Sequence, residues 1–417
     1  MTSFRFLHAA DIHLDSPLHG LARYDGVPVD EIRGATRAAF DNLVQYAIDE
    51  AVDFVVIAGD LFDGDWKDMG TGLYFARAMG RLHQVDIPVF VLAGNHDAAS
   101  VLTKSVPWPP NVRQFASRKP ETHRIERLMV AVHGQSFANA AVSENLALAY
   151  PEREEHAFNI GVLHTALAGR PGHASYAPCT VDDLRTKGYD YWALGHVHDH
   201  EVACEDPYVV FPGNIQGRTI RETGPKGAVL VEVTNREVTS VTPIELDVIR
   251  WARVEVDCSN ASADAVLPLM REALVRAHTG LSAGRPMVAR LVLAGETEAA
   301  GELQDKASGL RDEARALAAA ISAELWIEKV QVRMSPPATQ PASEIGEDFV
   351  ALIAEAPENA ALVLALAEDL APFLSAAHAS LGEAEVDELR HAADAGDWPR
   401  LVNAATLALQ SRLAAAN

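Results

Sequence analysis

The sequence predicts an α/β fold, and three observations support this prediction. Short apolar runs that end in glycine or polar residues, such as VDFVVIAG, IPVFVLAG and FNIGVLHT, are typical of buried strands covered on both faces. Patterns with the helical period lie between them, over Asp30 to Glu50 and roughly Thr71 to Gln84. The length of 417 residues exceeds what one hydrophobic core usually serves, so we expect more than one domain.

The order of the elements divides the chain into three domains and a linker. After Lys187 the pattern changes to strands and turns, with a hairpin at Thr234-Asn235, and we assign residues 1–250 to the first domain. Residues 251–335 alternate between strand and helix patterns, which predicts a small β-α-β-α-β domain. A linker rich in Pro, Ser and Thr over 336–346 then leads to a helical tail over 347–417, rich in Ala and Leu.

The charge of the chain is acidic and unevenly distributed. The net charge of −23 argues against a protein that coats nucleic acid nonspecifically, but it leaves room for a local binding patch. Residues 340–417 carry 3 basic and 13 acidic residues, so the tail is the part least suited to contact phosphates. Asn111 to Leu128 is locally basic, and it fits either a solvated loop or a basic rim beside an active site.

The sequence shows no pattern typical of a membrane span, a signal peptide or a disulfide framework. No apolar run reaches ~18 residues without a charge, which argues against a membrane span. The N-terminus lacks the pattern of a signal peptide, so we expect a cytoplasmic location. The chain has three unevenly spaced cysteines, so we do not expect a disulfide framework.

Five short polar segments follow strand-like runs. Because the carboxyl ends of strands in an α/β sheet form the ligand site, we expect these segments to meet in space. Asp11 and His13, like His196 and His198, are two residues apart, so in extended backbone each pair leaves the same face. The five segments are Asp11-Ile12-His13, Gly59-Asp60-Leu61-Phe62-Asp63, Gly94-Asn95-His96-Asp97, His164 in GVLHT, and Gly195-His196-Val197-His198.

This donor set predicts a metal site. It offers carboxylate, imidazole and amide oxygen without thiolate, which suits Mn²⁺, Fe²⁺ or Zn²⁺ better than Ca²⁺. One ion would be over-supplied with ligands, whereas two ions that share a bridging carboxylate would use them all. Taken alone, each segment could instead be the cap of a strand, a turn or a pair of surface histidines. All five segments together, in this order and each at the end of a strand, indicate a binuclear metal centre.

The order D-x-H, GD-x-x-D, GNHD, H, GHVH resembles the calcineurin-like metallophosphoesterase superfamily. Wider stretches, namely HLDSPLHGL, IRGATRAAFDNLV, FVVIAGDLFDGDWKDMGTG and GNHDAAS, are similar to bacterial YhaO-type DNA repair exonucleases, relatives of the SbcD nuclease. The resemblance covers nearly all of residues 1–335 and is loose in the C-terminal part. It implies a four-layer α-β-β-α core with a small α/β cap domain and a helical tail.

The resemblance also implies a role for each site residue. Asp11, His13 and His198 would hold the first metal, and Asn95, His164 and His196 the second, with Asp60 between them. His96 would contact the phosphate or protonate the leaving oxygen, with Asp97 orienting its ring. Asp63 matches the bacterial members, where archaeal and eukaryotic relatives commonly have histidine. His8, Asp15, His133 and His200 are interpreted as supporting or structural residues.

The implied function is that of a Mn²⁺-dependent DNA exonuclease in repair, which works with an SMC-like coiled-coil ATPase. By analogy with the family, the protein would form a homodimer. Residues 251–335 would be the cap that guides DNA, and the tail would dock on the ATPase. A phosphatase or phosphodiesterase acting on nucleotides or phosphoproteins is the enzymatic alternative, and a scaffold with a degenerate site is the non-enzymatic one. The complete ligand set argues against degeneracy. The tail also fits a self-contained helical hairpin.

Overall fold

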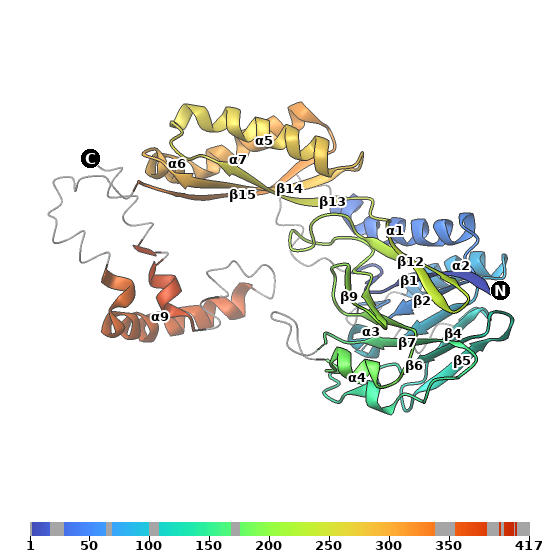
Figure 1. Cartoon of the computed structure of the whole chain (residues 1–417). Helices are drawn as coiled ribbons and strands as arrows, with labels where there is room; N and C mark the ends of the chain where they lie inside the picture. Colours follow the sequence, from blue (N-terminus) through green and yellow to red (C-terminus); the bar gives the residue numbers. More distant parts are fainter. Residues whose placement is uncertain are drawn as a thin grey trace, which may run out of the picture. The chain divides into compact units, whose positions relative to one another are not determined.

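A computed structural model gives the fold (Figure 1). It describes residues 2–16, 29–63, 69–99, 108–167, 176–337, 355–381, 392, 396–403 and 405–406. Contacts divide the chain into two compact units, one that ends at Trp251 and one that begins at Ala252. In these described ranges, no helix is long and apolar enough to cross a membrane.

The first unit contains two six-stranded sheets. The first has the order β12-β11-β1-β2-β3-β4, in which β1 to β4 run parallel and β11 and β12 form an antiparallel edge. Its strands are β1 (Ser3–Ala9), β2 (Phe54–Ala58), β3 (Val89–Leu92), β4 (Val112–Gln114), β11 (Gly227–Thr234) and β12 (Glu237–Glu245). Between the parallel strands come α1 (Val29–Asp49), α2 (Met69–His83) and α3 (Asn95–Ala99).

The second sheet has the order β5-β6-β7-β8-β10-β9. Strands β6, β7, β8 and β10 run parallel, and antiparallel partners close both edges. Its strands are β5 (Glu121–Ile125), β6 (Val130–Gly134), β7 (Phe158–His164), β8 (Tyr191–Gly195), β9 (Glu201–Glu205) and β10 (Tyr208–Phe211). The short helices nearby are η3 (Glu126–Leu128), η4 (Leu146–Ala149) and α4 (Val181–Arg185).

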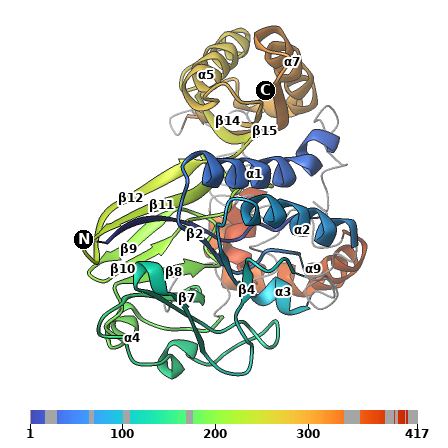
Figure 2. The ribbon, with the colours of Figure 1, turned by 90° about the vertical axis from the view of Figure 1, so that its right-hand side faces the viewer.

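Three apolar cores separate four layers in this unit. One core packs α1 and α2 against the first sheet, through residues such as Phe40 and Phe75. A second core lies between the two sheets and contains Phe6, Phe54 and Tyr191. The third lies on the outer face of the second sheet, beneath η4 and α4. Figures 1 and 2 show α1 and α2 beyond one sheet and α4 beyond the other, so the predicted α-β-β-α core is confirmed.

Local differences from the sequence prediction have clear causes. The hairpin is present, but its two turn residues are Asn235 and Arg236, both with positive φ, as the twist of a two-residue hairpin favours. The segment Asn111 to Leu128 was interpreted as a loop or rim, yet it contains β4, β5 and η3. Arg113 and Arg124 occupy exposed positions of the edge strands β4 and β5, where polar side chains hide the strand pattern.

The second unit has a three-stranded sheet with helices against it. Its strands are β13 (Arg250–Asp257), which spans the boundary at Trp251, β14 (Met287–Glu296) and β15 (Leu325–Ser335), with β14 and β15 parallel. Its helices are η5 (Ala263–Ala265), α5 (Val266–Leu281), α6 (Ala300–Asp305) and α7 (Ala307–Ile321). The sequence pattern predicts one helix where α6 and α7 lie, and the structure breaks it at Lys306.

The described part of the tail is helical. It contains η6 (Ala356–Glu358) and α9 (Ala360–Leu381), on which the side chains of Leu362, Leu364 and Leu370 are exposed. Most of the predicted linker, and of the tail beyond α9, lies outside the described residues.

Candidate metal centre

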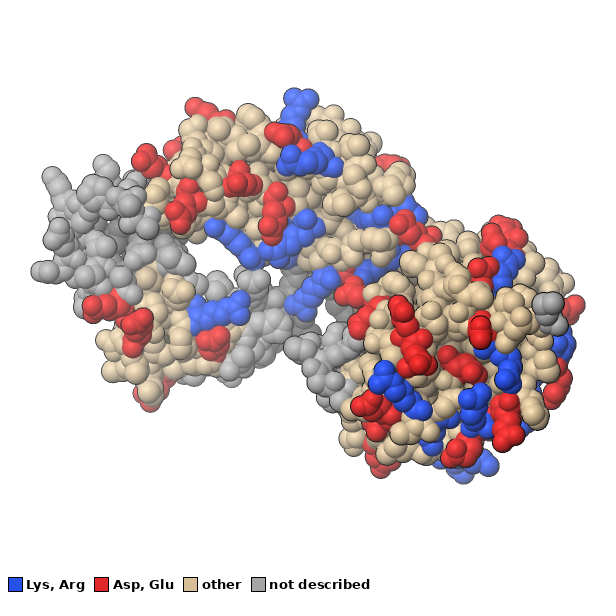
Figure 3. All heavy atoms as spheres, viewed as in Figure 1, with Lys and Arg blue, Asp and Glu red and all other residues tan. Residues whose placement is uncertain are grey.

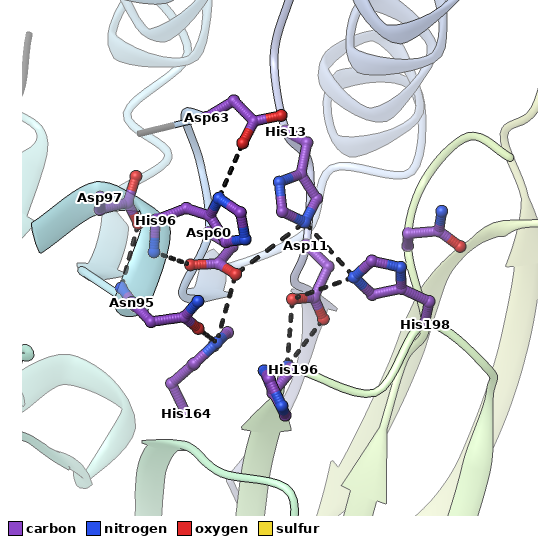
Figure 4. A network of polar contacts seen from close by, with 12 residues as sticks. Asp11, His13, Asp60, Asp63, Asn95, His96, Asp97, His164, His196 and His198 are labelled. Carbon is purple, nitrogen blue, oxygen red and sulfur yellow. Dashed lines mark hydrogen bonds and ion pairs between the residues drawn. The ribbon is translucent and has the colours of Figure 1, made fainter. Parts of the chain in front are cut away.

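The predicted site residues come together at the carboxyl ends of five strands from both sheets (Figure 4). Asp11 follows β1, Asp60 follows β2, Asn95 begins α3 after β3, His164 ends β7, and His196 follows β8. Backbone hydrogen bonds from Asp11 N to Gly59 O and from His13 N to Asp60 O join the first two loops. The segments therefore meet because the strands that precede them are neighbours.

Several of these residues have left-handed backbone. Asp11, His13 and Asp60 have φ of 50°, 44° and 50°, and His196 has φ of 95°. Asp and His adopt this conformation more readily than most residues other than glycine, and the chain turns sharply there as each strand ends. The side chains that follow these turns point toward one another (Figure 4).

One ligand group consists of Asp11, His13 and His198, whose donor atoms lie within 4.8 Å of one another. The Nε2 atoms of His13 and His198 are 3.3 Å apart, and Nε2 of His198 is 3.9 Å from Asp11. Nδ1 of His198 donates to Glu222 at 2.7 Å, which leaves Nε2 as a lone-pair donor directed at the group. Such a carboxylate–histidine pair is the usual support of a metal-binding imidazole.

A second group consists of Asp60, His164 and His196, with Oδ1 of Asn95 beside it. Nδ1 of His164 lies 3.0 Å from Ala58 O, which can only accept, so this nitrogen carries the proton. Nε2 then faces Oδ1 of Asn95 at 2.9 Å and Oδ2 of Asp60 at 3.4 Å. The three groups are directed at one point and need a cation between them, either a proton on Nε2 or a metal ion. Imidazole, amide and carboxylate together fit a divalent metal.

Asp60 lies between the groups, since it also groups with His13 and His96. The residue is 1% exposed, and its carboxylate is 3.9 Å from Nε2 of His13. Burial works against the charge of Asp60, but the neighbouring histidines hold the pKa of Asp60 well below its usual value. Burial likewise disfavours charge on His164, yet Asp60 raises the pKa of His164 to about 9. The site thus attracts positive charge.

His96 is the exposed imidazole of the centre. Its side chain is 41% exposed, whereas those of His13 and His164 are at most 1% exposed. Nδ1 of His96 lies 2.7 Å from Oδ1 of Asp63, and this hydrogen bond raises the pKa of His96 above its usual value. Asp63 is also bound by the hydroxyl of Ser16 at 2.6 Å.

The expected role of Asp97 needs correction. Its carboxylate accepts the backbone N–H groups of Gly94, Leu61 and Phe62, and Asp63 is the carboxylate on the ring nitrogen of His96. Consecutive side chains on a helix diverge, so Asp97 points back to the start of α3. There it ties α3 to the loop after β2. Burial and the nearby Asp60 raise the pKa of Asp97 to about 7.

Two residues of the centre were missed by sequence reasoning, namely Arg218 and Glu222. Glu222 holds His198, and its other carboxylate oxygen accepts Arg218 N at 2.6 Å. Both residues lie in the irregular loop between β10 and β11, seven and eleven residues after the last residue of β10, so neither directly follows an apolar run. Their four-residue spacing alone is no signal outside a helix, so nothing in the pattern distinguished them.

The nearby polar residues are structural. His8 bonds Tyr191 and Leu194 O, and His200 bonds Phe211 O. Asp15 accepts from Thr71 and Arg37, and His133 bonds Thr122 and Asn159.

The basic segment over Asn111 to Leu128 has paired arginines. Arg124 pairs with Glu154, and Arg127 pairs with Asp53. Asp53 precedes β2, whereas the metal-site residue Asp60 follows that strand. Arg127 is therefore at the opposite end of β2 from the centre, so Arg127 itself does not belong to a basic rim beside the centre.

Comparisons with known proteins agree with this geometry. Residues 4–200 match the model of the calcineurin-like phosphoesterase family, and residues 251–335 match that of the middle domain of metallophosphoesterase YhaO. YhaO of Bacillus subtilis (strain 168), described as an uncharacterized metallophosphoesterase, is 37% identical over 300 residues, which cover 71% of this chain and 72% of that protein.

Solved structures also align with the chain. One is TT1561 of Thermus thermophilus, at 13% identity and a TM-score of 0.33, over 59% of this chain and 100% of that chain. Another is a dimetal phosphatase from Danio rerio, at 13% identity and a TM-score of 0.35, over 59% and 98%.

The fold and the ligand groups define a metallophosphoesterase, a phosphoester hydrolase of a family that binds a dimetal centre. Within that class, the chain belongs to the YhaO family of calcineurin-like metallophosphoesterases.

Proposed function

We propose that this protein is a Mn²⁺-dependent DNA exonuclease that acts in DNA repair in the cytoplasm, together with an SMC-like coiled-coil ATPase. The observation that carries the hydrolytic part is the exposed imidazole of His96 beside two ligand groups that share Asp60. The unit that begins at Ala252 supports a polymeric substrate, because a compact phosphatase does not need it. The resemblance to SbcD-like nucleases assigns this unit to DNA guiding.

The residues divide the chemistry among them. Two divalent ions, when bound, would neutralise the phosphate and activate a water. Asp63 accepts from Nδ1 of His96, which leaves Nε2 of that ring for the substrate. In-line attack on phosphorus moves charge onto the leaving oxygen, and the cationic form of His96 can donate a proton there.

Charge on the surface bears on how DNA is held. On the face seen in Figure 3, acidic and basic side chains are interspersed over the first unit. With a net charge of −23, we expect weak unaided binding to DNA and a strong dependence on salt. The ATPase partner would then supply much of the affinity.

The alternative is a phosphatase or phosphodiesterase that acts on nucleotides or phosphoproteins. The same centre serves these reactions, because the ligand groups recognise the phosphate and not the rest of the substrate. Small substrates would be hydrolysed without the partner and with little dependence on salt.

The deciding experiment is degradation of end-labelled double-stranded DNA with added Mn²⁺. The parent should shorten DNA from its ends. Asp60→Ala should lower the rate more than about 100-fold through loss of metal, and His96→Ala by about 100- to 10,000-fold with metal retained. Asp49→Ala, at an exposed position of α1 in the first unit, is the matched control and should behave as the parent.

Each outcome selects a function. Shortening of DNA by the parent alone supports the exonuclease. If the parent leaves DNA intact with and without the ATPase, yet hydrolyses a small phosphodiester in an Asp60-dependent way, the nucleotide alternative holds. If His96→Ala hydrolyses substrate at the parent rate, the role of His96 is wrong.

A further inference from the structure

Arg218 is the cation nearest the two carboxylates that position the histidines of the centre. Its side chain is only 16% exposed. One terminal nitrogen lies 3.2 Å from Oε1 of Glu222, and the other lies 3.7 Å from Oδ2 of Asp63. Glu222 holds His198, and Asp63 holds His96, so Arg218 lies between a ligand of the first group and the exposed imidazole.

The hydrogen-bonding capacity of Arg218 is not used up by these contacts. Among the described residues, its buried Nε has no hydrogen-bond partner. The 3.7 Å contact with Asp63 is an ion pair that is too long for a hydrogen bond. A guanidinium has five N–H donors in a planar fork, and a buried one costs free energy unless its donors find acceptors.

The charge of Arg218 acts on the centre itself. Its guanidinium contacts the carboxylates of Glu222 and Asp63, which hold His198 and His96. A cation in this position attracts an anion that approaches these imidazoles.

We propose that Arg218 is a substrate-binding residue that donates to the phosphate oxygens of a phosphoester held at this centre. The planar fork matches two oxygens of a phosphate better than a single carboxylate oxygen at 3.7 Å does. An acidic protein needs local positive charge to accept an anionic substrate. This inference rests on the proposed phosphoester hydrolysis, but it does not require that the substrate is DNA.

Inorganic phosphate is the probe that tests this role. Titration calorimetry of the Mn²⁺-loaded full chain would compare the parent with Arg218→Gln and Arg218→Lys. We expect Arg218→Gln to weaken phosphate binding at least about 10-fold, because a charged hydrogen bond is lost. Arg218→Lys should bind with intermediate affinity, since it keeps the charge and loses the fork.

Two further readouts separate binding from support of the metal ligands. Metal content, measured by elemental analysis after gel filtration, should equal that of the parent. KM for bis(p-nitrophenyl) phosphate should rise in Arg218→Gln by a larger factor than kcat falls. Arg81→Gln, which removes an exposed arginine paired with Asp41, controls for the change in net charge and should keep the parent's phosphate affinity.

The results that overturn the proposal are specific. Equal phosphate affinity in the parent and Arg218→Gln would show that Arg218 binds no phosphate. Loss of metal in both Arg218 variants would show that it only braces Glu222 and Asp63. If Arg218→Gln does not fold, Arg218→Lys decides between these results. If the parent hydrolyses no phosphoester, the proposed function is wrong. The phosphate titration would still show whether Arg218 binds phosphate.

Discussion

Asp63 and Asp97 are both carboxylates, but they have different roles, which their positions on the backbone determine. Asp97 is the neighbour of His96 in sequence, yet its carboxylate accepts three backbone N–H groups. Asp63 comes from the loop after a different strand and binds the ring of His96. A carboxylate next to a histidine in sequence is therefore weak evidence for a dyad, because on a helix the two side chains diverge.

His8 gives a prediction for the dependence of stability on pH. It is fully buried, with one ring nitrogen on Tyr191 and the other on Leu194 O. Burial lowers the pKa of His8 to about 3 from its usual value of 6.5. Below pH 6.5 the unfolded chain binds a proton that the folded chain excludes, so stability falls as the pH falls from 6.5 toward 3.

The measurement compares the parent with His8→Gln in urea unfolding at about pH 7.5 and about pH 5. The variant should be less stable at the higher pH by about 1–3 kcal/mol, because its buried partners lose a hydrogen bond. The advantage of the parent should shrink by about 2 kcal/mol at the lower pH. His83→Gln, at an exposed position of α2, controls for the loss of any one histidine. An advantage that does not change with pH would contradict a neutral buried His8.

At the scale of elements, strand ends from the two sheets approach each other closely beside the centre. A Cβ added to Gly195, at the end of β8, would lie 2.0 Å from Ala58 O on β2 and 2.9 Å from Nδ1 of His164. Ala58 O is also the acceptor for that nitrogen. The absence of a side chain at Gly195 therefore lets the two sheets converge and leaves room for His164 of the second ligand group.

We expect Gly195→Ala to lower the free energy of unfolding by about 3 kcal/mol, through forced separation of the strands. It should also weaken metal binding, because His164 moves. Gly80→Ala is the matched control, since no heavy atom lies within 4 Å of a Cβ built there in α2. It should stabilise the protein by about 0.5–1 kcal/mol. Urea midpoints and metal titrations check both, and equal stability of the two variants would refute the close approach.

At the scale of the whole molecule, the tail beyond residue 340 is the part proposed to dock on the ATPase. Three leucines of α9 are exposed, Leu362, Leu364 and Leu370. Deleting residues 340–417 should abolish binding of the coiled-coil ATPase in a pull-down assay and leave metal-dependent phosphodiester hydrolysis at the parent rate. Exposed apolar surface of this kind is typical of helices that pack into a groove of a partner.

Substitutions refine this test. Serine at Leu362, Leu364 and Leu370 together should weaken ATPase binding, whereas serine at Val275 and Leu281, which are exposed on α5, should not. If the truncated chain binds the ATPase as well as the parent does, docking lies elsewhere and the tail is a self-contained helical element.

The sequence by itself determined the fold class and the position of most of the centre. Buried strands are apolar throughout, and the polar residues directly after them must lie at the sheet edge, so Asp11, Asp60, Asn95, His164 and His196 could be assigned from pattern and spacing. Helices α1 and α2 begin and end within two residues of their predicted bounds, because their apolar period is strong.

Only the tertiary structure decided the contacts that support those residues. Arg218 and Glu222 come from an irregular loop, and the partner of His96 comes from another strand end. Strands β4 and β5 carry exposed polar residues at sheet edges and were not expected. Periodicity reports which residues are buried, but a hydrogen bond between loops depends on where the packed sheets place them, and no local pattern encodes that distance.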